Sequence, residues 1–287
     1  MDATLTRTHH HTHSPGAPTL SRLSSRVWTT RWTASPGASL LVGRGAELTV
    51  VDHGMSTEAT ERLLTEVATA APALRLRRMV WLRWDHGSGE RTPEHAERLH
   101  ADQIRPAASF APGSPRVLSH RLNIPSLPGV SAHAPSADQL LLWDRTDRIL
   151  LAGDLLAPVA PELWGLTPSQ AEQALRWISD CAPHQVVGSH GTLLSGADIE
   201  RAITSRLTYL RVLRQQAIRA HRSGATERLA LHQALTEGVL AQWAVAPERH
   251  LINLHAALAE HTGRALDMDA VATDVRRVLA ERGTRLL

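Results

Sequence analysis

Four predicted strand ends in this chain carry an acid or a histidine beside a glycine. The four segments are Asp52-His53-Gly54, Asp85-His86-Gly87, Gly153-Asp154 and Ser189-His190-Gly191. Strand ends are where α/β scaffolds usually place their chemistry, and a neighbouring glycine lets the backbone turn sharply there. Carboxylate oxygens and imidazole nitrogens together suit Zn²⁺ and, less tightly, Fe²⁺ or Mn²⁺. The expected ligands of one such ion are Asp85, His86, Asp154 and His190. An ion with an open coordination position would lower the pKa of water to about 7 and make hydroxide available at neutral pH.

The pattern of apolar residues predicts the strands and helices that must position these side chains. The predicted strands and hairpins cover residues 26–33, 38–54, 74–82, 116–120, 139–154 and 185–191. The predicted helices among them cover residues 56–70, 92–99 and 167–181. Strands that alternate with helices in this way indicate an α/β fold.

Residue composition and the predicted secondary structure divide the chain into three parts. Residues 1–24 are rich in Thr, Ser, Pro and His without periodicity, which predicts a disordered tail. Residues 25–196 hold the strands and the candidate site. Residues 197–287 form a helical C-terminal region, whose predicted helices cover 197–222, 226–243, 247–262 and 267–282.

Composition narrows the class of protein. The 287 residues are 43% hydrophobic, which is enough for a sizeable core, and no apolar run is long enough to span a membrane. The single cysteine, Cys181, excludes an internal disulfide and favours a reducing compartment, so we expect a cytoplasmic protein. The formal net charge is only +3, which does not argue for nucleic acid as a partner. The expected partner is a small-molecule substrate. The oligomeric state stays open.

The order of the four motifs resembles that of the metallo-β-lactamase superfamily over about residues 26–195. This resemblance implies a four-layer αββα sandwich with a metal site along one edge of the two sheets. The C-terminal helices resemble the appended helical region of many hydrolases in that superfamily. Its members hydrolyse β-lactams, thioesters, lactones and phosphodiesters, so the resemblance implies a scaffold more sharply than a substrate.

The chain departs from the superfamily at one half of the site. The signature His-x-His-x-Asp-His reads Trp81-Leu82-Arg83-Trp84-Asp85-His86 here, so both leading histidines are absent. The third ligand of that first metal site would fall on Pro135, and His133, two residues away, could replace it only if the loop shifted. The resemblance implies that the second site is complete, with Asp154 in the place of the bridging carboxylate. A degenerate first site and a single metal are therefore expected.

Several neighbours are candidates for binding the substrate. Arg83 could supply the positive charge of the missing metal and hold a carboxylate or phosphate of the substrate. Trp81 and Trp84 could line a pocket, although at least one of them is expected in the core. His133 is a further candidate for contact with the substrate. His53 could shuttle a proton or be an ordinary loop histidine. Asp52 is expected to support the metal ligands without binding the ion itself.

Two functions follow from these residues. The first is a hydrolase that uses one metal-bound water to cleave a thioester, ester or lactone, with Asp85 and His190 as its catalytic residues. The alternative is a metal-free or inactive member of the same fold, which binds a ligand or partner or does metal-independent chemistry in the same cleft.

Overall fold

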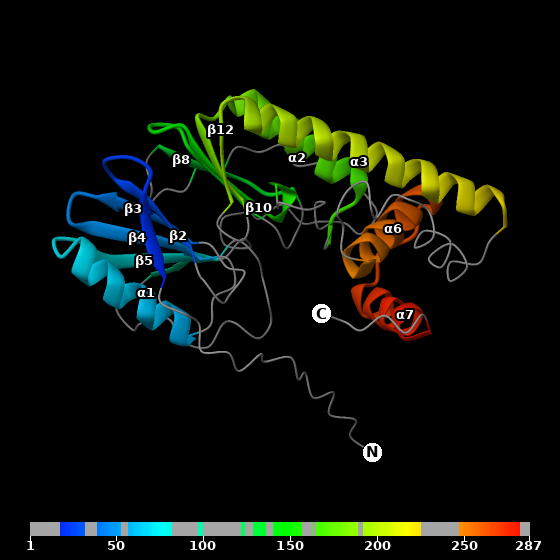
Figure 1. Cartoon of the computed structure of the whole chain (residues 1–287), viewed down its shortest axis with the longest axis horizontal. Coiled ribbons are helices and arrows are strands. Elements are labelled where there is room, and N and C mark those ends of the chain that lie inside the picture. Colours follow the sequence, from blue (N-terminus) through cyan, green and yellow to red (C-terminus); the bar gives the residue numbers. More distant parts are fainter. Residues whose placement is uncertain are drawn as a thin grey trace, which may run out of the picture.

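The structure is a computed structural model, which describes part of the chain. The described residues are 18–31, 39–52, 57–81, 97–99, 122–123, 129–135, 140–156, 163, 165–188, 192–224 and 247–281. Two six-stranded sheets form the centre of this structure, and helices lie outside them (Figure 1).

The first sheet has the strand order β1-β2-β3-β4-β5-β6. Its strands are β1 (Thr19–Arg22), β2 (Val27–Arg31), β3 (Leu40–Arg44), β4 (Glu47–Asp52), β5 (Arg75–Trp81) and β6 (Glu97–Leu99). The pairs from β1 to β4 are antiparallel, and β5 runs parallel to both β4 and β6.

The second sheet has the strand order β12-β11-β10-β9-β8-β7. Its strands are β7 (Leu122–Asn123), β8 (Val130–His133), β9 (Leu141–Asp144), β10 (Ile149–Gly153), β11 (Gln185–Gly188) and β12 (Leu193–Ser195). Only the β10–β11 pair of this sheet is parallel within the described residues.

The helical elements are α1 (Thr57–Ala70), the short 3₁₀ turn η1 (Asp154–Leu156), α2 (Pro168–Cys181), α3 (Ala197–Arg222), α6 (Pro247–Thr262) and α7 (Met268–Glu281). Helix α2 begins with a capping box, in which the Thr167 hydroxyl accepts from the Gln170 backbone and the Gln170 side chain accepts from Thr167. Pro168 at its first position suits a helix start, because the missing N–H would have no intrahelical partner there.

Alternation along the strands creates the layers. Leu41 and Val50 of the first sheet pack with Leu63 of α1, whereas Leu40 and Val51 face the second sheet. Leu142 and Leu151 of the second sheet lie in this inter-sheet cluster, and Leu141 and Leu150 pack instead against the helices beyond. The resulting order is α1, first sheet, second sheet and α2, which confirms the predicted αββα sandwich.

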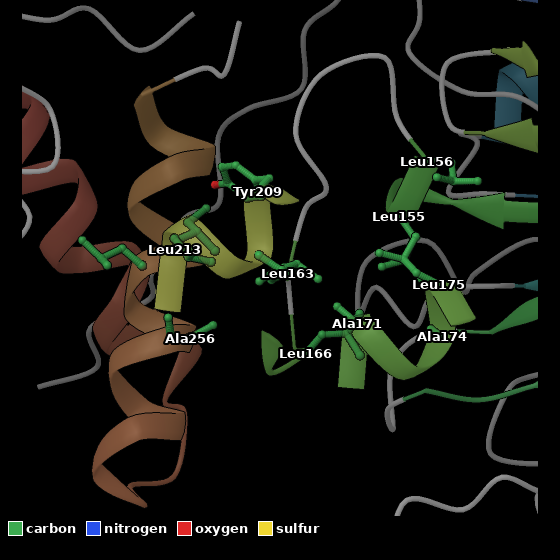
Figure 2. Packing of buried hydrophobic residues seen from close by; sticks show 14 of the residues in the cluster. Leu155, Leu156, Leu163, Leu166, Ala171, Ala174, Leu175, Tyr209, Leu213 and Ala256 are labelled. Carbon is green, nitrogen blue, oxygen red and sulfur yellow. The ribbon is translucent and has the colours of Figure 1, made fainter. Parts of the chain in front are cut away.

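The core outside the second sheet continues into the C-terminal helices. One cluster of buried residues includes Leu155 of η1, Leu175 of α2, Leu213 of α3, Leu254 of α6 and Val275 of α7. Figure 2 shows this packing, with Leu163 and Leu166 lying between the sandwich and the helices. The predicted C-terminal helices 197–222, 247–262 and 267–282 are confirmed within one or two residues.

Some predictions differ from the structure. Residues 97–99, predicted to end a helix, form β6, because pairing with β5 outweighs the local helix-start signal of Thr92-Pro93. Thr19–Arg22, within the segment predicted to be disordered, pairs with β2 as strand β1. The short strands β8 and β12 were not predicted. The predicted strand 116–120 and helix 226–243 lie outside the described residues.

Candidate functional site

The first sheet brings two of the singled-out segments to neighbouring positions. Strands β4 and β5 are parallel, and their last residues, Asp52 and Trp81, are paired in register. The ends of these two strands therefore lie side by side at one end of the sheet. In the sequence, β4 is followed by His53, and β5 is followed by Arg83, Trp84, Asp85 and His86, all of which lie outside the described residues. The side chains of Asp52 and Trp81 are not described either.

The second sheet repeats this relationship at the ends of β10 and β11. These strands are parallel, and Gly153 is paired with Gly188 across a register shift after Leu151. Gly153 has φ +54°, a left-handed conformation that favours glycine. An irregularity of this kind is common beside functional sites, because it redirects the next side chain. That next residue is Asp154, the first residue of η1, whose side chain is buried at 9% exposure.

A close backbone contact fixes η1 against the end of β11. A Cβ atom placed on Gly188 would lie 2.6 Å from the carbonyl oxygen of Leu156, which is closer than any real side chain tolerates. The turn that begins at Asp154 therefore rests directly on the last residue of β11. His190, two residues beyond Gly188, lies outside the described residues, as do its neighbours Ser189 and Gly191.

The donor chemistry of Asp154 suits a metal site, but the remaining predicted ligands are outside the described residues. Within those residues, no group of three or more His, Cys, Asp and Glu side chains could hold a metal ion. Because Asp85, His86 and His190 are not among them, the predicted metal site stays a prediction.

His133 lies on the face of the second sheet that α2 covers. Its ring is stacked on Trp177 of α2, with 4.7 Å between ring centroids and 16° between the planes. The side chain is 4% exposed, and burial lowers its pKa from 6.5 to about 4. Its Nε2 atom makes no hydrogen bond within the described structure. This geometry is that of a neutral core histidine, and its role in substrate binding stays a prediction.

An ion-pair cluster, which was not predicted from the sequence, joins the start of β2 in the first sheet to the end of β9 in the second. The Arg26 guanidinium, just before β2, donates from Nη2 to both Asp144 oxygens at 2.6 and 2.7 Å and from Nε to Asp147 at 2.8 Å. Asp144 ends β9, and β10 starts just beyond it, so this cluster lies at the opposite end of β10 from Asp154. It ties the sheets together away from the candidate site.

A second unpredicted network joins α2 to the C-terminal helices. Arg214 of α3 donates to Glu172 of α2 at 2.6 Å and to Glu260 of α6 at 3.2 Å. Glu260 in turn accepts from the backbone N–H of Ser169 at 2.8 Å, in the first turn of α2. Three helices therefore meet at one guanidinium, and a carboxylate of α6 stabilises the N-terminus of α2.

A third network is buried between α3 and α6. The Asn253 side chain accepts a hydrogen bond from the backbone N–H of Leu163 at 2.9 Å and donates one to the Tyr209 hydroxyl at 3.0 Å. The Tyr209 hydroxyl also lies 2.9 Å from Nδ1 of His250. Burial raises the pKa of Tyr209 above its usual range, so its hydroxyl keeps its proton. No sequence signal could have found this network, because it depends on how α3 and α6 pair.

No helix within the described residues is long and apolar enough to cross a membrane.

Comparison with known proteins gives likenesses of structure. No protein-family model matches the chain, and no curated protein matches it. The chain is similar to the metallo-β-lactamase FIM-1 from Pseudomonas aeruginosa in its mono-zinc form, with 14% identity and a TM-score of 0.47 over 68% of this chain and 96% of that one. It is similar to the metallo-β-lactamase from Pontibacter korlensis, with 16% identity and a TM-score of 0.47 over 67% and 99% of the two chains. It is also similar to that from Hirschia baltica, with 14% identity and a TM-score of 0.48 over 65% and 96%. These are likenesses of fold alone, and the layers described above agree with the metallo-β-lactamase-like sandwich expected from the sequence.

Proposed function

We propose that the chain is a metal-dependent hydrolase with one divalent ion held by Asp85, His86, Asp154 and His190. The observation that carries the proposal is the arrangement of paired strand ends. Asp154 is buried at the end of β10, and the neighbouring β11 ends at Gly188, two residues before His190. In the first sheet, the segment that carries Asp85 and His86 continues from Trp81, which is paired with Asp52.

The donor set is that of a Zn²⁺ site, with two carboxylates and two imidazoles, and it also admits Fe²⁺ or Mn²⁺. When bound, such an ion supplies Lewis acidity and lowers the pKa of water to about 7. The protein would supply the rest. His86 and His190 would hold the ion, Asp154 would complete its shell, and Asp85 would orient the attacking water.

The substrate would be bound by side chains around the first metal site, whose histidine ligands are absent from this chain. Arg83 would stabilise the developing oxyanion or hold an acidic group of the substrate. Trp81, Trp84, His53 and His133 are the further candidates for contact with a small-molecule thioester, ester or lactone. The single cysteine, Cys181, supports a reducing, cytoplasmic setting.

Metal titration of the full chain tests the proposal. Because His9, His10, His11 and His13 could bind stray metal, all proteins in the test would carry serine at these four positions. We expect this parent to bind one Zn²⁺ per chain, and Asp154→Ala and His190→Ala to lose that ion. Asp198→Ala is the matched control, because within the described residues this exposed carboxylate pairs with its neighbour Arg201 in α3.

Activity against model thioesters, esters and lactones separates the two functions. The hydrolase predicts that Arg83→Ala keeps the ion and loses turnover, and that Asp154→Ala loses both. A parent that binds no Zn²⁺, Mn²⁺ or Fe²⁺ would overturn the proposal. Function that survives Asp154→Ala and His190→Ala but not Arg83→Ala would establish the metal-free alternative instead.

A further inference from the structure

In the buried hydrogen bonds between α3 and α6, the donor and the acceptor of each bond are fixed by one backbone N–H group. The N–H of Leu163 can only donate, so the atom of Asn253 that faces it must be the amide oxygen. The amide nitrogen of Asn253 then donates to the Tyr209 hydroxyl, which leaves the hydroxyl proton for Nδ1 of His250. Every member of this chain of bonds therefore has a defined role, and Asn253 can satisfy both of its neighbours in only one orientation.

Burial makes this arrangement rigid. Leu163, Tyr209, His250 and Asn253 are all fully buried, so no solvent competes for their hydrogen bonds. Leu163 also accepts a hydrogen bond from the backbone N–H of Leu166 at 3.2 Å, just before the capping box of α2. A buried N–H that loses its acceptor is costly, and the segment at Leu163 is therefore held tightly against α6.

The turn η1, which starts at Asp154 of the candidate site, packs in the same core as Leu163. Leu155 and Leu156 of η1, directly after Asp154, are buried in the cluster that also contains Leu163 and Tyr209. The Leu156 carbonyl rests on Gly188 of β11. Leu156 and Leu163 are each held by a backbone contact of their own, to Gly188 and to Asn253. Figure 2 shows both leucines in the same buried cluster.

We propose that Asn253 is a positioning residue for Asp154. By holding Leu163, Asn253 fixes one side of the buried cluster that also contains Leu155 and Leu156 of η1, and it thereby limits the movement of the Asp154 carboxylate. The C-terminal helices in this way support the site of the sandwich domain. This inference rests on the proposed function in taking Asp154 as a metal ligand, but the movement of η1 can be measured without a metal.

Amide hydrogen exchange on the full chain provides that measurement. Asn253→Leu removes the acceptor for Leu163 at similar volume, whereas Asn253→Asp keeps an oxygen that can accept from the same N–H. We expect Asn253→Leu to speed exchange about tenfold or more at Leu163 and also at Asp154–Leu156. Asn253→Asp should restore the slow exchange. Val275→Ala is the matched control, because Val275 is buried in the same core on α7 and should leave exchange at Asp154–Leu156 unchanged.

Zn²⁺ affinity is the second measurement, made at a temperature where all variants are folded. Supporting residues behind metal ligands typically contribute 10–100-fold to affinity, so we expect a rise in Kd of roughly that size for Asn253→Leu and near-parental affinity for Asn253→Asp and Val275→Ala. Faster exchange at Leu163 with unchanged exchange at Asp154–Leu156 would overturn the inference. If the parent binds no metal, the proposed function fails, and exchange at Asp154–Leu156 alone decides whether Asn253 positions η1.

Discussion

The imidazole of His133 lies almost flat on the indole of Trp177, with 4.7 Å between their centroids. One ring comes from β8 and the other from α2, so this stack joins the second sheet to the helix that covers it. Burial holds the imidazole in its neutral form by lowering its pKa to about 4. The contact therefore makes the stability of the fold depend on pH.

We expect the free energy of unfolding to fall as the pH falls from about 6.5 to about 4. In this window the unfolded chain protonates His133 and the folded chain does not, so acid favours the unfolded state. The contribution is complete above the unfolded pKa and amounts to about 3 kcal/mol. Urea unfolding of the parent and of His133→Phe at pH 7 and pH 4.5 isolates this effect. A parent that loses no more stability on acidification than His133→Phe would contradict the prediction.

Removal of the Arg26 guanidinium should destabilise the sandwich. Asp144 is 2% exposed and accepts two hydrogen bonds from Arg26, so Arg26→Met would leave a buried carboxylate without its cation. We expect a loss of about 3 kcal/mol in unfolding free energy.

Arg201→Ala serves as the control for this measurement, because the Arg201–Asp198 pair is largely exposed and should contribute less than about 1 kcal/mol. Equal losses for the two variants would show that the Arg26 cluster does not tie the sheets together.

Gly188→Ala should disturb η1 without any change in charge. The added Cβ would meet the Leu156 carbonyl at 2.6 Å, so η1 must move away from β11. Overpacking of this kind costs about 1–3 kcal/mol, and we expect Zn²⁺ affinity to fall with it.

Gly43→Ala is the matched control, since its Cβ would meet the Trp28 ring at 3.1 Å and the end of the Leu74 side chain at 3.3 Å, and side chains can yield. Thermal unfolding and Zn²⁺ titration of both variants check the prediction. Undiminished Zn²⁺ affinity in Gly188→Ala would separate η1 from the metal site.

Thr167→Ala should weaken the start of α2. The Thr167 hydroxyl accepts from the Gln170 backbone, and loss of such a cap costs about 1 kcal/mol. Thr167→Ser retains the hydroxyl and should cost much less. Chemical denaturation of the two variants distinguishes the cap from other effects of the substitution.

The sequence was most informative where the signal was local. Apolar runs bounded by turn residues predicted β3, β4, β9 and β10, and the Thr167-Pro168 start predicted α2. The Gly153-Asp154 strand end was also visible, because an apolar run that stops at glycine marks the place. The short strands β8 and β12 were missed, since three or four residues carry too little pattern and depend on a partner strand for their stability.

The contacts between elements far apart in the sequence could not be predicted for a different reason. The Asn253–Tyr209 hydrogen bond joins residues 44 apart in the sequence, and the Arg26–Asp144 pair joins residues 118 apart. Such contacts depend on the packing of whole elements. The need for glycine at position 188 likewise became apparent only when η1 was seen to rest on it.

The hydrophobic cluster shared by η1, α2, α3, α6 and α7 bears on how this protein can be engineered. Helices taken from another protein could not simply be fused after β12, since the chimera would expose the apolar side of α2 and leave the Leu163 amide without its acceptor. Any replacement of the C-terminal helices would have to include a residue that accepts the hydrogen bond from Leu163, as Asn253 does.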